Sequence, residues 1–569
     1  MMEGWCLLLG TMALLTGTLA EDSKWGGLYP RESGSREVKS LDGLWNFRLA
    51  PLHDPLQGFR EEWFLRPLSK TGSVISMAVP SSYNDVTQDK ALRDHIGWAW
   101  YDRTFYVPVR WQTDKQRVVL RLGSAHYNSI IYINGVAVTS HEGGHLPIMA
   151  EISSGLRFGK ENLVTVAINN TLTPSTLPQG KIVYHNDPTK YPPGYFEQTL
   201  DFDFFNYAGL HRPVYLYTTP QTYIDDIVVN TDIDGSAGII NYKIFAATSG
   251  IGPQTEDNVG CSVKLLDNEG DHVTSAMGCV GTIKISNASL WWPYLMHSNP
   301  GYMYTLMAAV SDEHGVLDLY PQKVGIRTLG WNSTTLTINN RPLYLRGCGR
   351  HEDADIRGKG VDYPLIVKNY MIVQCCVCLF CSNVVNATKA VDATRPVTCV
   401  LNYPKDEEHA GSSLDVILVN RYFSWYSDTG HLELIYNQTV NEFMEWHLLH
   451  NKPVMISEYG AGSIAGFHMD PSFTWTEEYQ ADLMVENFKA FDTLRSKGYF
   501  FGEMIWNFAD FSTPMEYNRP GACMKGLFTR ARQPKMAGHL MRMRYWSLAQ
   551  NIHNVTIPKG VRSPLHIIT

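Results

Sequence analysis

The pattern of apolar residues changes once along the chain, at about residue 341, and this change limits the fold more than any other feature. Before it, short alternating runs of apolar and polar residues are separated by turns, which is typical of antiparallel β-sandwiches. After it, short apolar strands alternate with helical stretches such as residues 477–498, which is typical of a parallel β/α architecture. Because 569 residues are too many for one core, we expect separate domains on the two sides of the change.

The β-rich part is long enough for two sandwiches. In residues 21–220, Asn134 and Gly135 lie between two alternating runs and predict a hairpin, because both residues tolerate positive φ. Residues 221–340 repeat the pattern with shorter strands, which favours a smaller immunoglobulin-like sandwich. We therefore predict two β-sandwiches followed by a β/α domain at 341–569.

The first residues are typical of a secretory signal peptide. Residues 5–20 are apolar and end in the small residues Thr18 and Ala20, where a signal peptidase could cut before Glu21. The run is too short to span a bilayer, so we predict a signal peptide over 1–20. Since no later segment offers about eighteen uninterrupted apolar residues, we expect a chain that does not span a membrane.

The sequons are consistent with passage through the secretory pathway, and the cysteines indicate neither a disulfide scaffold nor a metal site. The six Asn-x-Ser/Thr sequons are candidate glycosylation sites, at Asn169, Asn287, Asn332, Asn386, Asn437 and Asn554. Beyond Cys6 in the signal peptide, nine cysteines remain, which is too few for a disulfide scaffold of this length. The cysteine cluster at 375–381 matches no zinc template, so we predict no metal site.

The net charge argues against a nucleic-acid partner. The chain carries a formal charge of −8 and has no basic block, whereas phosphate backbones require clustered Lys and Arg.

Acidic residues at predicted strand ends suggest glycoside cleavage, which needs two carboxylates that flank the scissile bond. Glu458 closes the apolar run 452–457 and precedes a glycine turn, where parallel strands of a barrel open into one cavity. The alternative for Glu458 is a salt-bridged structural role. Glu503 lies earlier in the next strand, which favours a structural role but leaves a catalytic one open. Trp506 is either a sugar platform or a core residue.

Several long strings resemble the β-glucuronidases of glycoside hydrolase family 2. They include SLDGLWNF, LRLGSAHYNSIIYINGV, RHEDADIRGKG, SEYGAGSIAGFH and GEMIWNFADF. Together with shorter matches they cover most of the chain. The resemblance implies a jelly-roll sugar-binding-like domain, an immunoglobulin-like domain and a (β/α)8-type barrel, and cleavage with retention of the anomeric configuration.

The resemblance also implies roles for individual residues. Glu458 matches the family's nucleophile and Tyr422 the tyrosine that contacts it. Asp203 and Asn420 match substrate-contacting positions, and Trp506, a further candidate for substrate binding, lies in the matched run WNFADF.

In the family, an Asn-x-Lys pair and an upstream arginine hold the glucuronate carboxylate. Here Lys525 and Arg519 match the two cations, while Cys523 replaces the asparagine.

The interval 369–395 departs from the family. Family members have several barrel strands there, together with an Asn-Glu-Pro motif whose glutamate is the general acid. In this chain the interval is shorter and contains no glutamate and no histidine. We therefore expect an incomplete barrel, and the general acid stays unknown. Glu503 is a neighbouring carboxylate, although retention needs the two carboxylates about 5 to 5.5 Å apart across the bond.

By this resemblance we expect a β-glucuronidase-type retaining hydrolase, without a cofactor, that removes terminal β-D-glucuronic acid from glycosaminoglycans or conjugates. The alternative is a catalytically impaired splice or paralogue form that binds sugar or a partner protein. A third hypothesis is a lectin-like module built on the first sandwich. The family further implies a lysosomal or secreted location and a homotetramer.

Overall fold

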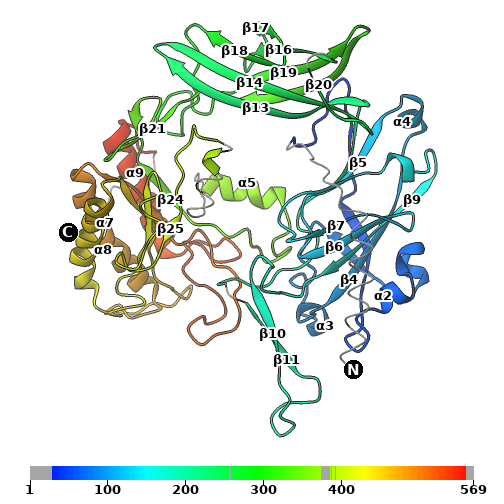
Figure 1. Ribbon diagram of the computed structural model, residues 1–569. Coiled ribbons are helices and arrows are strands. Elements are labelled where there is room, and N and C mark those ends of the chain that lie inside the picture. Colours follow the sequence, from blue (N-terminus) through cyan, green and yellow to red (C-terminus); the bar gives the residue numbers. More distant parts are fainter. Residues whose placement is uncertain are drawn as a thin grey trace.

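The computed structural model describes residues 28–200, 202–255, 258–372, 385, 388–390 and 392–558. Two β-sandwiches and a β/α body follow one another around an arc, and the second sandwich lies between the other two (Figure 1). In these ranges no helix has the length and apolar character needed to cross a membrane. The predicted signal peptide, the sequon at Asn386 and the cysteine cluster at 375–381 lie outside the described residues.

The first body is a jelly-roll-like sandwich of two antiparallel sheets, as the sequence predicts. Its strands are β1 (Val38–Ser40), β2 (Gly43–Leu49), β3 (Ile75–Val79), β4 (Trp98–Tyr106), β5 (Arg117–Leu122), β6 (Asn128–Ile133), β7 (Val136–Glu142), β8 (Ile148–Glu151), β9 (Glu161–Asn169) and β12 (Val214–Thr219). One sheet has the order β3-β2-β4-β9-β6-β7 and the other β1-β12-β5-β8. Trp45, Tyr101 and Leu216 contribute to the core between them. Asn134 and Gly135 form the predicted turn between β6 and β7, both with positive φ.

Three short helices lie at the surface of this sandwich, α2 (Gln57–Arg60), α3 (Lys90–Arg93) and α4 (Val109–Thr113). A two-stranded hairpin of β10 (Gly180–Tyr184) and β11 (Phe196–Leu200) projects away from it (Figure 1). The segment that follows this hairpin carries Asp203 toward the β/α body.

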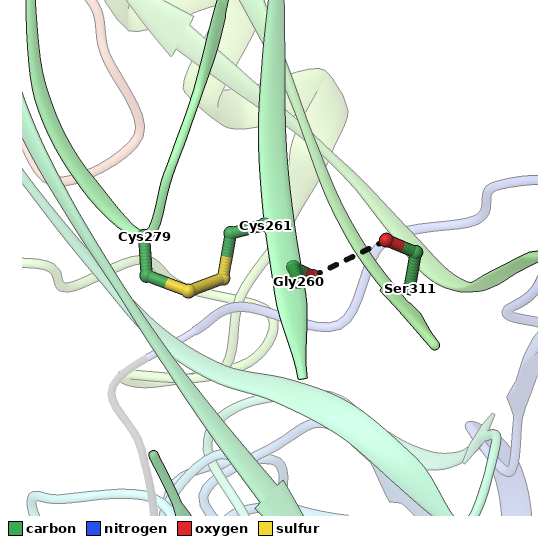
Figure 2. The surroundings of a disulfide bond; sticks show 4 residues. All are labelled: Gly260, Cys261, Cys279 and Ser311. Carbon is green, nitrogen blue, oxygen red and sulfur yellow. Dashed lines mark hydrogen bonds between the residues drawn. A yellow bond between two sulfur atoms is a disulfide. The ribbon is translucent and has the colours of Figure 1, made fainter. Parts of the chain in front are cut away.

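The second body is an immunoglobulin-like sandwich. Its strands are β13 (Thr222–Asp234), β14 (Ala237–Thr248), β15 (Gly252–Gln254), β16 (Gly260–Leu266), β17 (His272–Met277), β18 (Val280–Ile285), β19 (Tyr304–Asp312) and β20 (Gly315–Val324). One sheet joins β13, β14, β15 and β18, and the other has the order β17-β16-β19-β20. A disulfide between Cys261 in β16 and Cys279 before β18 links the two sheets (Figure 2). This pairing had no signal in the spacing of the cysteines.

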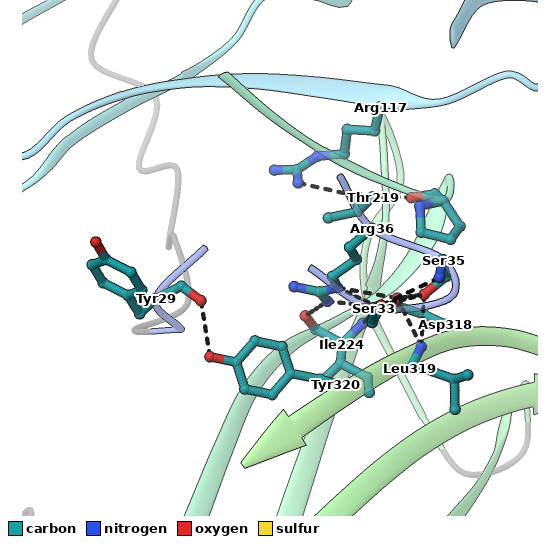
Figure 3. Close-up of polar contacts among 11 residues, drawn as sticks. Tyr29, Ser33, Ser35, Arg36, Arg117, Thr219, Ile224, Asp318, Leu319 and Tyr320 are labelled. Atoms are coloured by element: carbon teal, nitrogen blue, oxygen red, sulfur yellow. Dashed lines mark hydrogen bonds and ion pairs between the residues drawn. The ribbon is translucent and has the colours of Figure 1, made fainter. Parts of the chain in front are cut away.

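A buried ion pair joins the two sandwiches (Figure 3). Arg36, which precedes β1, donates from Nε and Nη2 to the carboxylate of Asp318 in β20. The same guanidinium donates to the Ile224 carbonyl at 2.6 Å, and Ser35 Oγ donates to Asp318 at 2.7 Å. The side chains of Arg36 and Asp318 are 4% and 0% exposed. Each charge therefore compensates the other for the hydration that both lose on burial.

The third body contains a five-stranded parallel sheet. Its strands are β24 (Leu345–Cys348), β25 (Val400–Leu401), β26 (Ile417–Asn420), β27 (Val454–Glu458) and β28 (Phe500–Ile505), in the order β24-β28-β27-β26-β25. The first and last strands are neighbours, which is how a β/α barrel closes. Among the described residues, however, no strand lies between β24 and β25 in sequence. These two strands therefore form the two edges of the sheet. This agrees with the predicted incomplete barrel.

Helices cover one face of this sheet. They are α7 (Ile435–His450), α8 (Glu477–Ser496) and α9 (Met536–His553), and α5 (Tyr363–Ile372) follows β24. The predicted helix at 477–498 is confirmed as α8, whose Thr476 side chain caps its first turn by accepting from the Tyr479 backbone N–H. Phe443, Phe491 and Met541 pack from the three helices against the sheet. A small sheet of β21 (Leu329–Trp331), β22 (Leu336–Ile338) and β23 (Arg341–Pro342) leads into β24.

We expect Asp318→Ala to lower the free energy of unfolding by about 3–5 kcal/mol, because it leaves the Arg36 charge buried and unpaired. Urea unfolding of the full chain measures this. Arg36→Met combined with Asp318→Leu should recover a large part of the loss. The matched control is Asp234→Ala, which removes the exposed ion pair with Lys284 and should change the transition little. Equal losses of stability in Asp318→Ala and Asp234→Ala would contradict the stabilising role of the buried ion pair.

Candidate active site

An open cavity of about 970 Å³ lies at the carboxyl ends of the parallel strands. Asn420 ends β26, Glu458 ends β27 and Trp506 follows β28, and all three line the cavity. Asp203 reaches the same cavity from the first sandwich. The structure therefore brings together residues that the sequence placed at separate strand ends.

Glu458 is partly buried, and the loss of water around it raises the pKa of its carboxyl group. Tyr422 opposes this shift, since its hydroxyl donates a hydrogen bond of 2.5 Å to Glu458 Oε2. Hydrogen bonding by Asn420 and the charge of Lys525 also lower the pKa of Glu458, and the Asp203 charge raises it. The carboxylate is thus oriented and partly desolvated, which suits a nucleophile.

The two predicted cations lie behind a tyrosine. Lys525 is 2% exposed, and its Nζ donates to the Tyr426 hydroxyl at 2.7 Å. Arg519 Nη2 donates to the same hydroxyl at 3.1 Å and to Asp203 at 2.7 Å. Tyr426 lines the cavity, whereas Lys525 and Arg519 do not. The sequence analysis did not single out Tyr426, although it lies four residues after Tyr422 on the same strand-end loop.

Lys525 also lies over aromatic rings. Its Nζ is 5.3 Å from the ring centre of Tyr422, 5.4 Å from that of Trp425 and 4.7 Å from that of Tyr426. These faces stabilise the ammonium group away from water.

Trp506 and His351 form an aromatic wall of the cavity. Their ring centres are 5.3 Å apart at a near-perpendicular angle, and His351 stacks on Phe511 at 3.6 Å. Burial lowers the pKa of His351 to about 3, so its imidazole is neutral above that pH. Gly349 packs against Trp506, and a Cβ there would lie 2.3 Å from the indole ring. The sequence analysis did not identify His351 as a cavity residue. Its position just after the end of β24 is the one feature of the sequence that could have indicated this.

Glu503 is placed elsewhere. It is fully buried in β28 and does not line the cavity. Arg544 of α9 donates to both of its oxygens, at 2.9 and 2.8 Å, and the Tyr344 hydroxyl donates at 2.8 Å. This corrects the catalytic prediction for Glu503, because its carboxylate is fully engaged between sheet and helix. The structural alternative fits the geometry.

A guanidinium fixes the first sandwich against the β/α body. Arg530 pairs with Asp85 of the sandwich and with Asp353 of the β/α body, and it donates to the Ala354 carbonyl at 3.1 Å. The hydroxyl of Tyr207 donates to Asp353 within the same cluster. Burial raises the pKa of Asp85 to about 6, against the opposing effect of Arg530. These contacts hold the loop that carries Asp203 at the cavity.

A partly buried, tyrosine-bound glutamate at the mouth of a parallel β/α body is an arrangement that glycoside hydrolases use. Three family models match the chain. They are the sugar binding domain of glycosyl hydrolases family 2 at 38–220, glycosyl hydrolases family 2 at 222–327, and the TIM barrel domain of that family at 331–378 and 375–550.

Individual relatives agree with the family models. β-Glucuronidase of Canis lupus familiaris is 42% identical over 612 residues, which covers 92% of this chain and 93% of that protein, and the Homo sapiens protein is 41% identical over 613. A solved β-glucuronidase from an uncultured Clostridium species is 33% identical with a TM-score of 0.81. That of Ruminococcus gnavus in complex with D-glucaro-d-lactam is 29% identical with a TM-score of 0.82. Each structure match covers 92% of this chain and 100% of the other.

These matches define a glycoside hydrolase. The chain belongs to glycoside hydrolase family 2, among its β-glucuronidases. The barrel match falls into two pieces that meet at 375–378, and the alignment with the dog relative is longer than the 569 residues of this chain. The relatives therefore contain residues without a counterpart here, which supports the predicted shortening at 369–395.

We expect Tyr422→Phe to raise the pKa of Glu458, because it removes a hydrogen bond that favours the ionised form. A water-soluble carbodiimide modifies protonated carboxyl groups, so labelling of Glu458 should extend to higher pH in the variant. Peptide mass mapping across a pH series measures this. Tyr403→Phe, on an exposed loop residue, is the control and should leave the midpoint in place. An unchanged midpoint in Tyr422→Phe would refute the coupling.

Proposed function

We propose that the chain is a β-glucuronidase-type retaining glycoside hydrolase that removes terminal β-D-glucuronic acid from glycosaminoglycans or conjugates. The observation that carries this is the pairing of Glu458 with Tyr422 in the cavity, beside a hydroxyl backed by two cations. The relatives are named β-glucuronidases, and one solved relative holds a glucaric acid lactam. These names do not favour the sugar-binding or partner-associating alternative.

In this proposal, ionised Glu458 attacks the anomeric carbon and forms a glycosyl-enzyme that water then hydrolyses, so the configuration is retained. Tyr422 and Asn420 orient this carboxylate by hydrogen bonds. Trp506 offers an aromatic wall to the sugar ring, and Asp203 and Asn420, which line the same cavity, bind its hydroxyl groups. Each of these roles rests on the position of the residue in the cavity lining.

Recognition of the acid sugar follows from the charge behind Tyr426. Lys525 and Arg519 both donate to its hydroxyl oxygen, so the hydroxyl proton is free to point toward the cavity. A uronate carboxylate that accepts this proton would lie close to two positive charges. Cys523 replaces the family's asparagine, which removes one amide donor.

The remaining proposals concern the whole protein. The predicted signal peptide and sequons support a lysosomal or secreted location, and the family supports a homotetramer. Asn287, Asn332, Asn437 and Asn554 are exposed and Asn169 is partly exposed, so a glycan could be attached at each.

We expect Glu458→Gln to abolish turnover of 2,4-dinitrophenyl β-D-glucuronide, because the amide cannot act as the nucleophile. In the unaltered chain, 2-deoxy-2-fluoro-β-D-glucuronyl fluoride should label Glu458, as intact mass and peptide mapping would show. Glu433→Gln, at an exposed position, is the control and should retain activity and labelling. A folded chain that binds a glucarolactam but shows neither turnover nor labelling would refute the hydrolase and support the impaired form.

We expect Lys525→Met to reduce kcat/KM for the glucuronide by about 10- to 100-fold, the value of one charge-assisted contact. The corresponding 2,4-dinitrophenyl β-D-glucoside, which lacks the carboxylate, should be affected far less. Lys489→Met on the exposed face of α8 is the matched control. Equal losses for both sugars would show that Lys525 does not recognise the acid group.

A further inference from the structure

Among the described residues, four carboxyl groups line the cavity, and the three other than Glu458 are candidate proton donors. Asp203 accepts from Arg519 through both oxygens, at 3.1 and 2.7 Å. Glu442 accepts from Arg421 at 2.8 Å and from the Trp446 indole at 2.8 Å. Acceptors of this kind carry no proton to give to a leaving group.

Asp406 is the remaining carboxylate of the lining. It is exposed on the loop after β25. Glycosidases keep a catalytic acid protonated at working pH by burial in an apolar site. The exposed loop that carries Asp406 provides no such apolar site.

Other acidic groups of the cavity are no better suited. His351 is neutral above a pH of about 3 and so is not an acid at working pH. Burial raises the pKa of Tyr422 far above its usual range, and its proton is already shared with Glu458.

A further source of a proton donor would be the interval in which the relatives carry extra residues. Between Lys368 and Asp392 the chain contains no aspartate, glutamate or histidine. This interval therefore supplies neither a carboxyl group nor an imidazole. Among the described residues that line the cavity, Glu458 is present as the nucleophile, and no second carboxyl group is both buried and free to donate a proton.

We infer that this cavity cleaves glucuronides whose aglycone departs as a stable oxyanion, such as acidic phenols and carboxylic acids, and leaves the glycosidic bonds of glycans intact. The inference rests on the proposed function and narrows its substrate class to activated conjugates. An alkoxide leaving group needs protonation as the bond breaks, and a positioned acid contributes about 10²- to 10⁴-fold to that step. A carboxylate or nitrophenolate leaves without it.

The reaction balances without a general acid. A Glu458 oxygen forms a bond to the anomeric carbon as the bond to the aglycone oxygen breaks, and the aglycone leaves with both electrons. Water then attacks the anomeric carbon, displaces Glu458 and releases its proton to solvent. An added anion such as azide can replace water and needs no deprotonation, so it should accelerate this second step and give the β-glucuronyl azide.

A series of aryl β-D-glucuronides tests the inference in the full chain. We expect kcat/KM to fall by more than about 10³-fold from 2,4-dinitrophenyl to 4-methylphenyl, whose phenol is about as weak an acid as tyrosine. Azide should raise kcat for the dinitrophenyl substrate. In Asp406→Asn the dependence on the leaving group should remain as steep.

Other outcomes separate the two proposals. Labelling of Glu458 by the fluorinated inhibitor together with similar kcat/KM values across the series would overturn the inference and leave the hydrolase standing. If Asp406→Asn then selectively lost the 4-methylphenyl substrate, Asp406 would be the acid. Absence of both labelling and turnover in a chain with a cooperative melt would overturn the hydrolase, and the inference with it.

Discussion

The site depends on the Arg530 guanidinium, which holds the first sandwich against the β/α body. Its partners come from both sides of this junction, with Asp85 on one and Asp353 on the other. Because these charges are largely desolvated, loss of one partner would leave an uncompensated charge inside the junction. The cavity is therefore a product of two domains, since Asp203 of the first sandwich and Glu458 of the β/α body both line it.

Local patterns were sufficient to predict the elements that carry the nucleophile. The apolar run before Glu458 became β27, and the amphipathic stretch after it became α8 with its Thr476 cap. The tyrosine contact was implied by family resemblance, and the 2.5 Å hydrogen bond from Tyr422 agrees with it. Strand ends converge in any parallel β/α sheet, so the strand pattern alone was sufficient to place Asn420, Glu458 and Trp506 near one another.

Contacts between residues that are distant in the sequence could not be predicted from these local patterns. Whether Glu503 is catalytic or structural depends on Arg544, which lies on α9 and has no sequence signal that links it to β28. Tyr426 stands between the cavity and the two cations because of a loop conformation that composition does not encode. The Cys261–Cys279 disulfide likewise depends on how two sheets stack. Spacing alone cannot identify a contact that the tertiary fold creates.

The pairing of β24 with β28 has a consequence for synthesis. Leu345 is aligned with Gly502, so β24 leaves the ribosome long before its neighbour exists. Both sandwiches are complete by then and can fold while the rest of the chain is still being made. The nascent β/α body must wait for its last strand, with apolar residues exposed in the meantime. Demand for chaperones should therefore be concentrated late in translation, at the stage when the reactive end of the molecule is assembled.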